Sequence, residues 1–222
     1  MTVDFLWRGR SRPTRGPKPA LTLERIADAA IAVADAEGLA AVSMQRVAAD
    51  LGYTKMSLYR YLPGKAELVA AMLERGIGAP PVLTATTWRA ALIEWAGALL
   101  ARYAARAWVL EVTALGGRPV GPNEVGWMES ALAMLPAGLT GAERLDTVAT
   151  VAGHVRMIAG QDGSPESEFS AAIGLVLREH ADRFPAVAAA VGDVAEQGGS
   201  DQAFHFGLER FLDGVEALIR AR

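Results

Sequence analysis

Residues 43–65, SMQRVAADLGYTKMSLYRYLPGK, decide how the first third of this chain folds. Ser43 and Thr54 are residue types that cap helix N-termini, and apolar residues follow each of them at helical spacing. Gly52 closes the first short helix, and the second runs from Thr54 to about residue 62, where Pro63 and Gly64 break it. The segment therefore predicts two short helices joined by a tight turn.

The small residues in this segment specify how the two helices meet. Ala48 stands where two helices cross closely, and Gly52 stands in the turn, where a positive φ is wanted. Val47, Leu51 and Leu58 then supply a minimal core. An earlier helix, capped by Thr22 and ended by Gly38, completes three short helices with the spacing of a helix-turn-helix unit.

The second helix of this unit carries hydrogen-bond donors and no acid. Leu58 points inward, which leaves the donors on the exposed face. In a helix-turn-helix unit the second helix enters the major groove of DNA, and neighbouring elements contact the backbone. The pattern thus predicts a recognition helix that faces a polyanion. Its exposed donors include Thr54, Lys55, Ser57, Tyr59, Arg60 and Tyr61, with Lys65 just beyond.

Outward from this segment, composition favours an all-α protein. About half of the 222 residues are apolar, and Ala and Leu dominate while β-branched runs are scarce. We expect about nine to ten helices. In the larger half they are predicted at Trp88–Ala105, Asn123–Leu135, Gly141–Gly160, Pro165–Ala181, Pro185–Val194 and Asp201–Arg220, with a shorter one before the break at 116–119. A fourth helix, 65–75, joins the halves.

Several functional classes are disfavoured by what the sequence lacks. There is no cysteine, and no apolar stretch approaches the length of about 20 residues that spans a bilayer. The N-terminus shows no hydrophobic signal region, so a cytoplasmic location is expected. The three histidines are far apart, and neither a GxSxG motif nor a Gly-rich phosphate loop occurs. We therefore expect no metal site, no cofactor and no enzymatic activity.

The charge is distributed unevenly. Residues 1–75 carry 11 Lys or Arg against 8 Asp or Glu, whereas residues 76–222 carry 11 against 17. Residues 1–19 are predicted to be a flexible basic arm, because Gly and Pro punctuate the run RGRSRPTRGPK at 8–18. Such a run is either a solvated tail or an arm that lies along phosphates or in a narrow minor groove.

Residues 20–75 resemble the tetracycline-repressor (TetR) family of bacterial transcription regulators. The resemblance rests on Glu37-Gly38, on SMQRVAADLG, and on the block Leu58-Tyr59-Arg60-Tyr61-Leu62 followed by Lys65. The family commonly has His where Tyr61 stands and Phe where Leu62 stands. Later stretches, WRAALIEWAGALLARYAARAWVLEV, GPNEVGWMESALAML and FHFGLERFLDGVEALI, resemble the family's ligand and dimer domain. The implied organisation is a DNA-binding domain at 20–65, a connecting helix and linker at 66–81, and a ligand-binding and dimerisation domain at 82–222.

The resemblance implies a role for each position of the DNA-binding domain. Tyr59, Tyr61 and Lys65 match a phosphate clamp, in which tyrosine hydroxyls and an ammonium group donate to phosphate oxygens. Thr22 and Ser43 offer donors at helix N-termini to the same phosphates. The family's base-reading positions are occupied by Gln45, Lys55 and Met56, which suit adenine, guanine and a thymine methyl group. Arg60 could serve either role.

In the larger half, aromatic and Met residues stand out together with a few polar groups. An apolar pocket between bundle helices is how the family holds a small molecule. The alternative is ordinary core packing. The candidate ligand-binding residues are Trp88, Trp95, Tyr103, Trp108, Asn123, Trp127, Met128, His154 and Met157, with Gln161 as a further polar candidate.

Two long apolar helices, 142–158 and 202–219, predict a homodimer, as the family's four-helix arrangement implies. Two recognition helices related by a two-fold axis predict a palindromic operator on double-stranded DNA. The resulting hypothesis is a repressor released from its operator by a small, largely apolar effector. The alternative is an effector-independent DNA-binding dimer that acts through protein partners or as an architectural factor. An enzyme with an incidental helix-turn-helix is the weakest reading.

Overall fold

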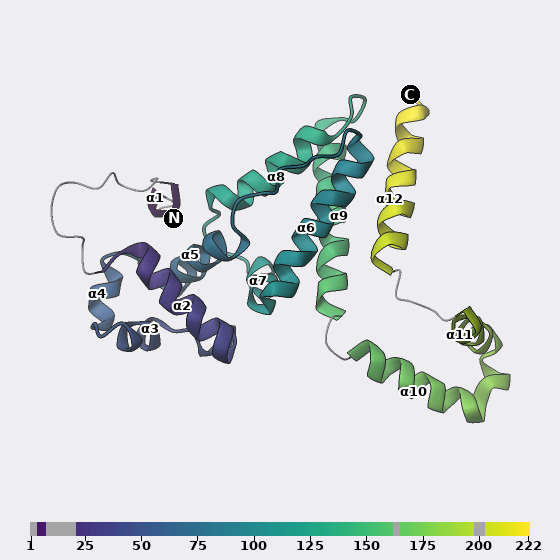
Figure 1. The fold of residues 1–222 in the computed structure, drawn as a ribbon, viewed down its shortest axis with the longest axis horizontal. Helices are drawn as coiled ribbons and strands as arrows, with labels where there is room; N and C mark the ends of the chain where they lie inside the picture. Colours follow the sequence, from purple (N-terminus) through teal and green to yellow (C-terminus); the bar gives the residue numbers. More distant parts are fainter. Residues whose placement is uncertain (1–3, 8–20, 162–164, 198–202) are drawn as a thin grey trace. The chain divides into compact units, whose positions relative to one another are not determined.

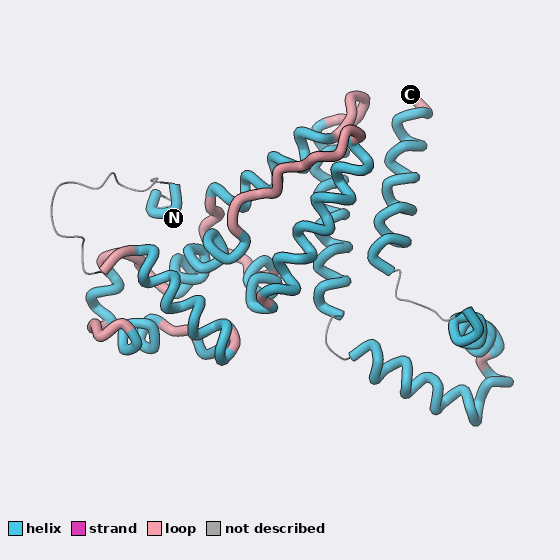
Figure 2. Tube along the Cα trace, viewed as in Figure 1, coloured by secondary structure: helices cyan, strands magenta, loops and turns pink. Residues whose placement is uncertain are grey.

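The computed structural model describes residues 4–7, 21–161, 165–197 and 203–222. Every regular element in these ranges is a helix, which confirms the all-α prediction (Figures 1 and 2). The chain divides into two compact units, Met1–Ala152 and Gly153–Arg222. The division falls inside one helix, α9, whereas the functional boundaries near residues 65 and 82 remain a prediction.

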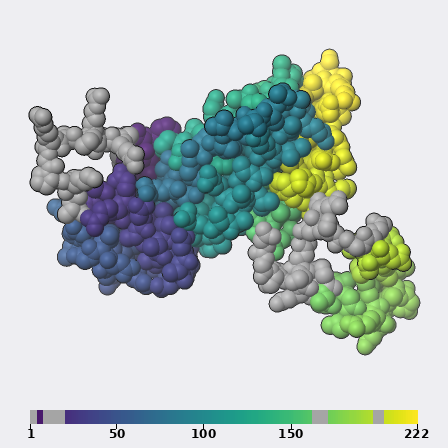
Figure 3. Space-filling view, in the orientation of Figure 1, coloured from purple at the N-terminus to yellow at the C-terminus, as the bar shows by residue number. Residues whose placement is uncertain are grey.

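The head of the first unit is formed by helix α2, Leu23–Glu37, the 3-10 turn η1, Leu39–Ala41, helix α3, Met44–Asp50, and helix α4, Lys55–Tyr59. These elements form one contiguous body, coloured purple to blue in Figure 3. Helix α3 packs against both α2 and α4. The predicted three-helix unit is confirmed.

Each of these three helices begins at a hydroxyl residue, as the sequence predicted. In all three caps the side-chain oxygen accepts the backbone N–H of the residue three positions on, at 3.1 to 3.3 Å. This bond satisfies one of the backbone donors that the first turn of a helix leaves without a partner. The capping residues are Thr22, Ser43 and Thr54.

The turn between α3 and α4 has the predicted geometry. Gly52 adopts a φ of 74°, in the left-handed region that side chains disfavour. Ala48 and Val47 are buried, and Leu58 is completely enclosed. Leu51 was predicted to lie in this core, but it is only half buried. It is the C-cap residue of α3 rather than an interior position, so it has left the buried stripe of that helix.

Helix α4 is shorter than predicted. It ends at Tyr59, whereas the sequence suggested an end near Leu62. After Tyr59 the last turn tightens, because the Tyr61 N–H bonds to the Leu58 carbonyl three residues back at 2.9 Å, and Pro63 then disfavours helical geometry in Leu62. Leu62 is nevertheless fully buried, and its N–H still bonds to the Leu58 carbonyl at 3.0 Å.

The helices that follow are mostly where the sequence placed them. The described ranges contain twelve α-helices, against the nine to ten expected. One additional helix, α1 at Asp4–Trp7, lies inside the segment predicted as a flexible arm. The apolar sequence Phe5-Leu6-Trp7 contains no Gly or Pro, and Trp7 has a hydrogen-bond partner in the folded protein. The remaining helices are α5, Lys65–Ile77; α6, Trp88–Ala105; α7, Ala107–Thr113; α8, Pro122–Met134; α9, Gly141–Gln161; α10, Pro165–His180; α11, Pro185–Gln197; and α12, Ala203–Arg220.

Helix α5 is shared between the head and the rest of the first unit. It packs against α2 of the head and also against α7 and α8. Residues 68–73 are all buried, so no side of this helix is free for solvent over that stretch. Near its end, a Cβ on Gly76 would stand 2.5 Å from the Trp108 ring. Glycine thus permits the close approach of α5 and α7.

The second unit contains the last residues of α9 together with α10, α11 and α12. Val155 on α9 and Leu208 and Leu212 on α12 are buried. The His154 ring lies 2.9 Å from the Phe204 carbonyl oxygen and stacks with the Phe204 ring. None of the helices in the described ranges combines the length and the apolar character that a bilayer crossing needs.

Replacing Gly52 by alanine should destabilise the protein by about 1–2 kcal/mol, the strain of an L-residue in left-handed geometry. Urea unfolding of Gly52→Ala against the parent protein measures this. Gly97→Ala is the matched control, because Gly97 lies within α6 and a Cβ there would meet nothing within 4 Å. Its stability should be unchanged or raised by up to about 1 kcal/mol. Equal losses in both variants would contradict the assignment of the turn.

Candidate nucleic-acid interface

Helix α4 presents the predicted donors to solvent. Leu58 is fully buried and fixes the helix on the head, while Lys55 and Arg60 are exposed. Met56 is 71% exposed and Tyr59 is 37% exposed. Single apolar side chains are common on protein surfaces, so the exposure of Met56 agrees with a solvent-exposed filler as well as with a contact to an external partner.

Two of the exposed side chains on α4 contact each other. The Lys55 ammonium nitrogen lies 5.5 Å from the centroid of the Tyr59 ring, one helical turn away. At an exposed site such a cation–π contact contributes about 0.5–1 kcal/mol. The contact restrains the lysine on the helix surface.

The hydroxyl groups of the helix caps already have partners within the head. Thr54 Oγ1 accepts the Ser57 N–H and lies 3.0 Å from Ser57 Oγ. Thr22 and Ser43 accept backbone N–H groups in the same way. The hydroxyl oxygens of these residues accept backbone N–H groups within the head. Only the hydroxyl hydrogen of each residue could therefore be donated to a phosphate. Gln45 is exposed on α3.

Tyr61 has a partner that the sequence did not reveal. Its ring is half buried, and its hydroxyl donates to the backbone carbonyl of Leu21 at 3.1 Å. The predicted donation to a phosphate would require this bond to be exchanged. In this structure Tyr61 instead joins the segment that follows α4 to the residue that precedes the N-cap of α2.

Lys65 occupies the first position of α5, directly after the Pro63-Gly64 break. The side chain is exposed, and the N-cap residue Gly64 provides no side-chain acceptor for the first turn. The backbone N–H groups and the dipole of a helix N-terminus favour an anion, and the Lys65 ammonium group adds to that preference, while Glu67 in the same turn opposes it.

Arg46 is a cation of the head that does not belong to the group of exposed donors. Arg46 donates to Glu37 at 2.7 Å and to Asp50 at 3.0 Å. The hydrogen bond to Arg46 lowers the pKa of Glu37, and the same bonds raise the pKa of Arg46. Because two acids surround it, Arg46 ties α2 to α3 instead of facing a phosphate. The i,i+4 spacing of Arg46 and Asp50 could have indicated one of these pairs from the sequence, whereas the pair with Glu37 could not be read from spacing within one helix.

The head is joined to α5 and α7 by polar contacts that sequence reasoning missed. Arg75 on α5 pairs with Asp28 on α2 at 2.6 Å. Asp35, also on α2, accepts from the Trp108 indole at 2.6 Å and from Arg106 at 3.2 Å. These bonds link residues 47 to 73 positions apart, and a local pattern carries no signal for them.

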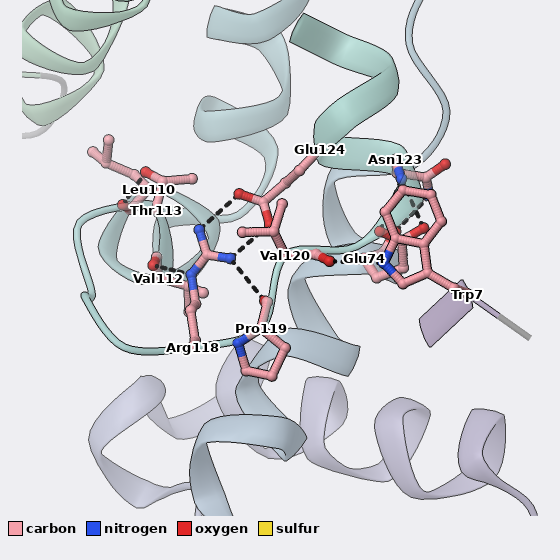
Figure 4. A network of polar contacts seen from close by, with 10 residues as sticks. All are labelled: Trp7, Glu74, Leu110, Val112, Thr113, Arg118, Pro119, Val120, Asn123 and Glu124. Atoms are coloured by element: carbon pink, nitrogen blue, oxygen red, sulfur yellow. Dashed lines mark hydrogen bonds and ion pairs between the residues drawn. The ribbon is translucent and has the colours of Figure 1, made fainter. Parts of the chain in front are cut away.

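A second joint connects α5 to the start of α8. The Glu74 carboxylate accepts the Asn123 N–H at 3.0 Å, and the Asn123 amide donates to the Glu74 carbonyl oxygen at 2.7 Å (Figure 4). Burial raises the pKa of Glu74. A polar groove of about 720 Å³ lies beside both joints. It is lined by Glu24, Asp28, Ile31, Glu74, Arg75, Gly78, Arg106 and Asn123.

Several candidate ligand-binding residues of the first unit already have hydrogen-bond or ring partners within the protein. Trp95 and Trp127 stand edge to face with centroids 5.8 Å apart, and the Trp95 indole donates to the Trp127 carbonyl. The Trp127 indole donates to the Gly78 carbonyl at 3.0 Å. Trp108 and Asn123 belong to the joints described above.

The other candidates differ in burial. Tyr103 is buried and Trp88 is half buried, whereas Met128 is 42% exposed. In the second unit, His154 contacts Phe204, and Met157 is 52% exposed. Within the part of the chain that the structure describes, no group of His, Asp and Glu residues is suited to hold a metal ion. The basic run at 8–18 lies outside the described residues.

Comparison with known proteins covers nearly the whole chain. Residues 21–72 match the family model described as bacterial regulatory proteins of the tetR family, and residues 80–219 match the model of the tetracyclin repressor-like C-terminal domain. The HTH-type transcriptional repressor DrrR1 of Streptomyces coeruleorubidus is 40% identical over 238 residues, covering 100% of this chain and 87% of that protein.

Solved structures share the fold. Apo ActR from Streptomyces coelicolor superposes with a TM-score of 0.79 at 25% identity, covering 92% of this chain and 99% of that chain. ActR in complex with actinorhodin gives a TM-score of 0.75 at 24% identity, covering 90% and 97%. The similarity therefore extends through both the head and the larger half.

The raised pKa of Glu74 has a consequence for stability that can be measured. In the folded protein this carboxyl keeps its proton at pH values where the unfolded chain, near 4.5, has released it. The stability that it contributes is complete below that value and is lost as pH rises through the folded pKa. Relative to Glu74→Gln, the parent protein should therefore gain stability as pH falls from about 7 toward 4.5.

Glu94→Gln provides a control for which the expected change of stability with pH has the opposite sign. Hydrogen bonds from the backbone of Ala85 and Thr84 lower the pKa of Glu94, so its contribution is present above 4.5 and is lost as pH falls through the folded pKa. Urea unfolding of the parent and both variants across this pH range measures the two trends. The same slope for both variants would contradict the half-buried placement of Glu74.

Proposed function

This chain belongs to the TetR family of bacterial transcription regulators, and from that premise we propose that it is a homodimeric repressor that a small, largely apolar molecule releases from a palindromic DNA operator. The observation that carries the proposal is the surface of α4. It combines exposed Lys55, Met56, Tyr59 and Arg60 with a buried Leu58 in a capped helix-turn-helix.

On DNA, the exposed side chains divide into two groups. Gln45, Lys55 and Met56 contact base edges in the major groove, where amide, ammonium and apolar groups distinguish the bases. Tyr59 and Lys65 donate to phosphates, which fixes the position of the head without reading sequence. The N-termini capped by Thr22, Ser43 and Thr54, together with Ser57, add donors to the backbone. Tyr61 joins them by exchanging its bond to Leu21, and Arg60 contacts a base or a phosphate.

The basic run at 8–18 extends this contact. Five cations without an acid are separated by Gly and Pro, which suits an arm lying along phosphates or in the minor groove. It provides the positive charge that the head partly cancels through the pairing of Arg46 with Glu37 and Asp50. A protein with a net charge of −3 can thereby be attracted to a polyanion at one end.

Dimerisation is supported by apolar residues that remain exposed on two long helices. On α9, Leu145 and Met157 are each 52% exposed, although other apolar residues of that helix are buried. On α12, Phe206 is 65% exposed while Leu208 and Leu212 are buried. A helix with apolar residues on more than one side needs a second partner, and a second copy of the chain supplies it.

The effector is proposed to bind among the aromatic residues of the larger half. ActR, which this chain resembles in fold, has been solved with actinorhodin. In this chain the candidates of the first unit are Trp88, Trp95, Tyr103, Trp127 and Met128. His154 and Met157 are separate candidates, which belong to the second unit. Trp108 and Asn123, already bound to Asp35 and Glu74, would transmit a movement of the bundle to the head.

The alternative is a DNA-binding dimer without an effector, acting through protein partners or as an architectural factor. One observation favours it: the indoles of Trp95, Trp108 and Trp127 each have a hydrogen-bond acceptor within the protein. Indoles satisfied in this way support a packed core as well as a pocket. Binding of a small molecule decides between the two functions.

Replacing phosphate-contacting residues should weaken binding to every DNA sequence. Lys65→Ala should reduce the slope of log affinity against log salt by up to about 0.9, because it removes one cation. Tyr59→Phe removes an uncharged hydroxyl, so it should weaken binding and leave the slope intact. Gln45→Ala should instead change which sequences are preferred and leave the slope intact. Binding to sequences selected from random DNA, measured at several salt concentrations, tests this. A change of sequence preference in Lys65→Ala alone would contradict the assignment.

An effector should quench the bundle tryptophans and release DNA together. Titration of the operator-bound dimer with actinorhodin as a first probe, followed by a panel of aromatic compounds, should lower operator affinity about 5- to 150-fold, the usual range of coupling between two sites. The readouts are tryptophan fluorescence and operator release. Quenching without release of DNA would contradict the proposed control of DNA binding by an effector. The absence of quenching across the panel would favour the effector-independent dimer.

A further inference from the structure

Helix α2 of the head carries two acids that bind residues outside the head. Asp28 and Asp35 are seven residues apart, so their side chains lie on one side of α2, about two turns and about 10 Å from each other. Arg75 on α5 binds Asp28 at 2.6 Å. Arg106, which precedes α7, and Trp108, within α7, both bind Asp35. The head is therefore held at two separate points, by residues of two different helices.

Trp108 reaches Asp35 because α5 and α7 approach each other closely at Gly76. A Cβ on Gly76 would stand 2.5 Å from the Trp108 ring, so glycine leaves the space that the ring occupies. Trp108 is only 3% exposed, and its indole N–H donates to the Asp35 carboxylate at 2.6 Å. Because a buried indole N–H requires an acceptor, the ring cannot turn away without losing this bond. Trp108 thus holds Asp35 from a rigid position.

Of the two bonds to Asp35, the one from Trp108 contributes more. The side chains of Arg106 and Asp35 are 42% and 39% exposed, and an ion pair so open to water adds little by itself. The indole donates from a buried ring to an ionised acceptor, and such charge-assisted bonds are roughly twice as strong as bonds between neutral groups. Asp35 is therefore fixed mainly by Trp108.

A palindromic operator makes two demands on a dimer. Each head must fit its half-site, and the two heads must stand at the correct distance and rotation. One base pair added between the half-sites moves one of them by about 3.4 Å and turns it by about a tenth of a helical turn. A head held through both Asp28 and Asp35 cannot follow this change unless one of these attachments breaks. The attachment of the head thus determines which spacing the dimer accepts.

We propose that Asp35 is a positioning residue for DNA recognition, which sets the half-site spacing of the operator through its bonds to Trp108 and Arg106. The inference rests on the proposed function as a dimeric repressor. It adds a determinant of specificity that lies outside the DNA-contacting surface. Asp35 acts on the orientation of the head, whereas the residues exposed on α4 act on the base sequence.

The test uses the full-length protein, an operator selected from random DNA, and two derivatives with one base pair added or removed between the half-sites. The quantity measured is the ratio of affinities for the selected and the altered operators. In Asp35→Ala this ratio should fall about fivefold or more, because a wrongly spaced operator no longer has to break the bonds of Asp35. An unchanged ratio would overturn the proposal.

Glu37→Ala is the matched control. Glu37 also lies on α2, is 47% exposed and forms an ion pair, but its partner Arg46 belongs to the head itself. Both variants remove one negative charge, so the change in attraction to DNA cancels in the ratio. The spacing ratio of Glu37→Ala should equal that of the parent protein. An equal fall in both variants would indicate a general loosening of the head and would refute the role of Asp35.

A double-mutant cycle separates the bond from the packing of the ring. Trp108→Phe keeps an aromatic ring but removes the indole donor, and it should lower the spacing ratio in the parent background. In the Asp35→Ala background the same change should have no further effect, because the acceptor is already absent. Additive effects would show that Trp108 acts through packing alone, which contradicts the proposal.

A measurement without DNA tests the bond itself. Asp35→Ala should shift the indole N–H resonance of Trp108 and leave those of Trp95 and Trp127, whose acceptors are the carbonyl oxygens of Trp127 and Gly78. An unmoved Trp108 resonance would contradict the bond.

The outcomes also separate this inference from the proposed function. If the parent protein binds the selected operator but accepts both altered spacings equally well, the proposed function stands and only the inference fails. If the Trp108 resonance responds to Asp35→Ala but the parent protein binds no duplex, the proposed function fails. The bonds of Asp35 are then purely structural, and the inference falls with it.

Discussion

The structure depends on helix α5, which packs against the head and against α7 and α8 at the same time. Residues 68–73 are buried without interruption because the head covers one side and α7 and α8 cover the other. A helix enclosed in this way cannot move with respect to one neighbour without disturbing the second. Its polar residues reinforce the constraint, since Arg75 holds Asp28 of the head and Glu74 holds the start of α8. The route from the larger half to DNA therefore passes through a packed joint.

Electrostatics explains how an acidic protein can present a surface for DNA. In the head, Arg46 is surrounded by Glu37 and Asp50 and contributes to the fold. The donors of residues 54–65, on α4 and up to the first residue of α5, have no acid in that stretch, although Glu67 follows in the first turn of α5. Charge is thus cancelled where helices meet and left uncompensated where a partner is to bind. The net charge of −3 conceals this local arrangement.

The aromatic residues of the larger half serve structure more than their sequence pattern suggested. Trp127 reaches the Gly78 carbonyl and Trp108 reaches Asp35, so each indole joins helices that are distant in sequence. Buried indoles seek an acceptor for their N–H, and here the acceptors lie at the joint between head and bundle. An effector that displaces such a ring would act directly on the contacts that hold the head.

The sequence by itself determined the local features of this protein: the hydroxyl caps at Thr22, Ser43 and Thr54, the turn at Gly52, and the exposed donors around a buried Leu58. These follow from interactions between residues a few positions apart, which propensity and spacing record. Only the tertiary structure decided the partners of Trp7, Tyr61, Trp108 and Asn123, and the pairing of Arg46 with Glu37 of the preceding helix. Periodicity shows which side of a helix is apolar, but a hydrogen bond between distant segments depends on how whole helices pack, and no local pattern encodes that.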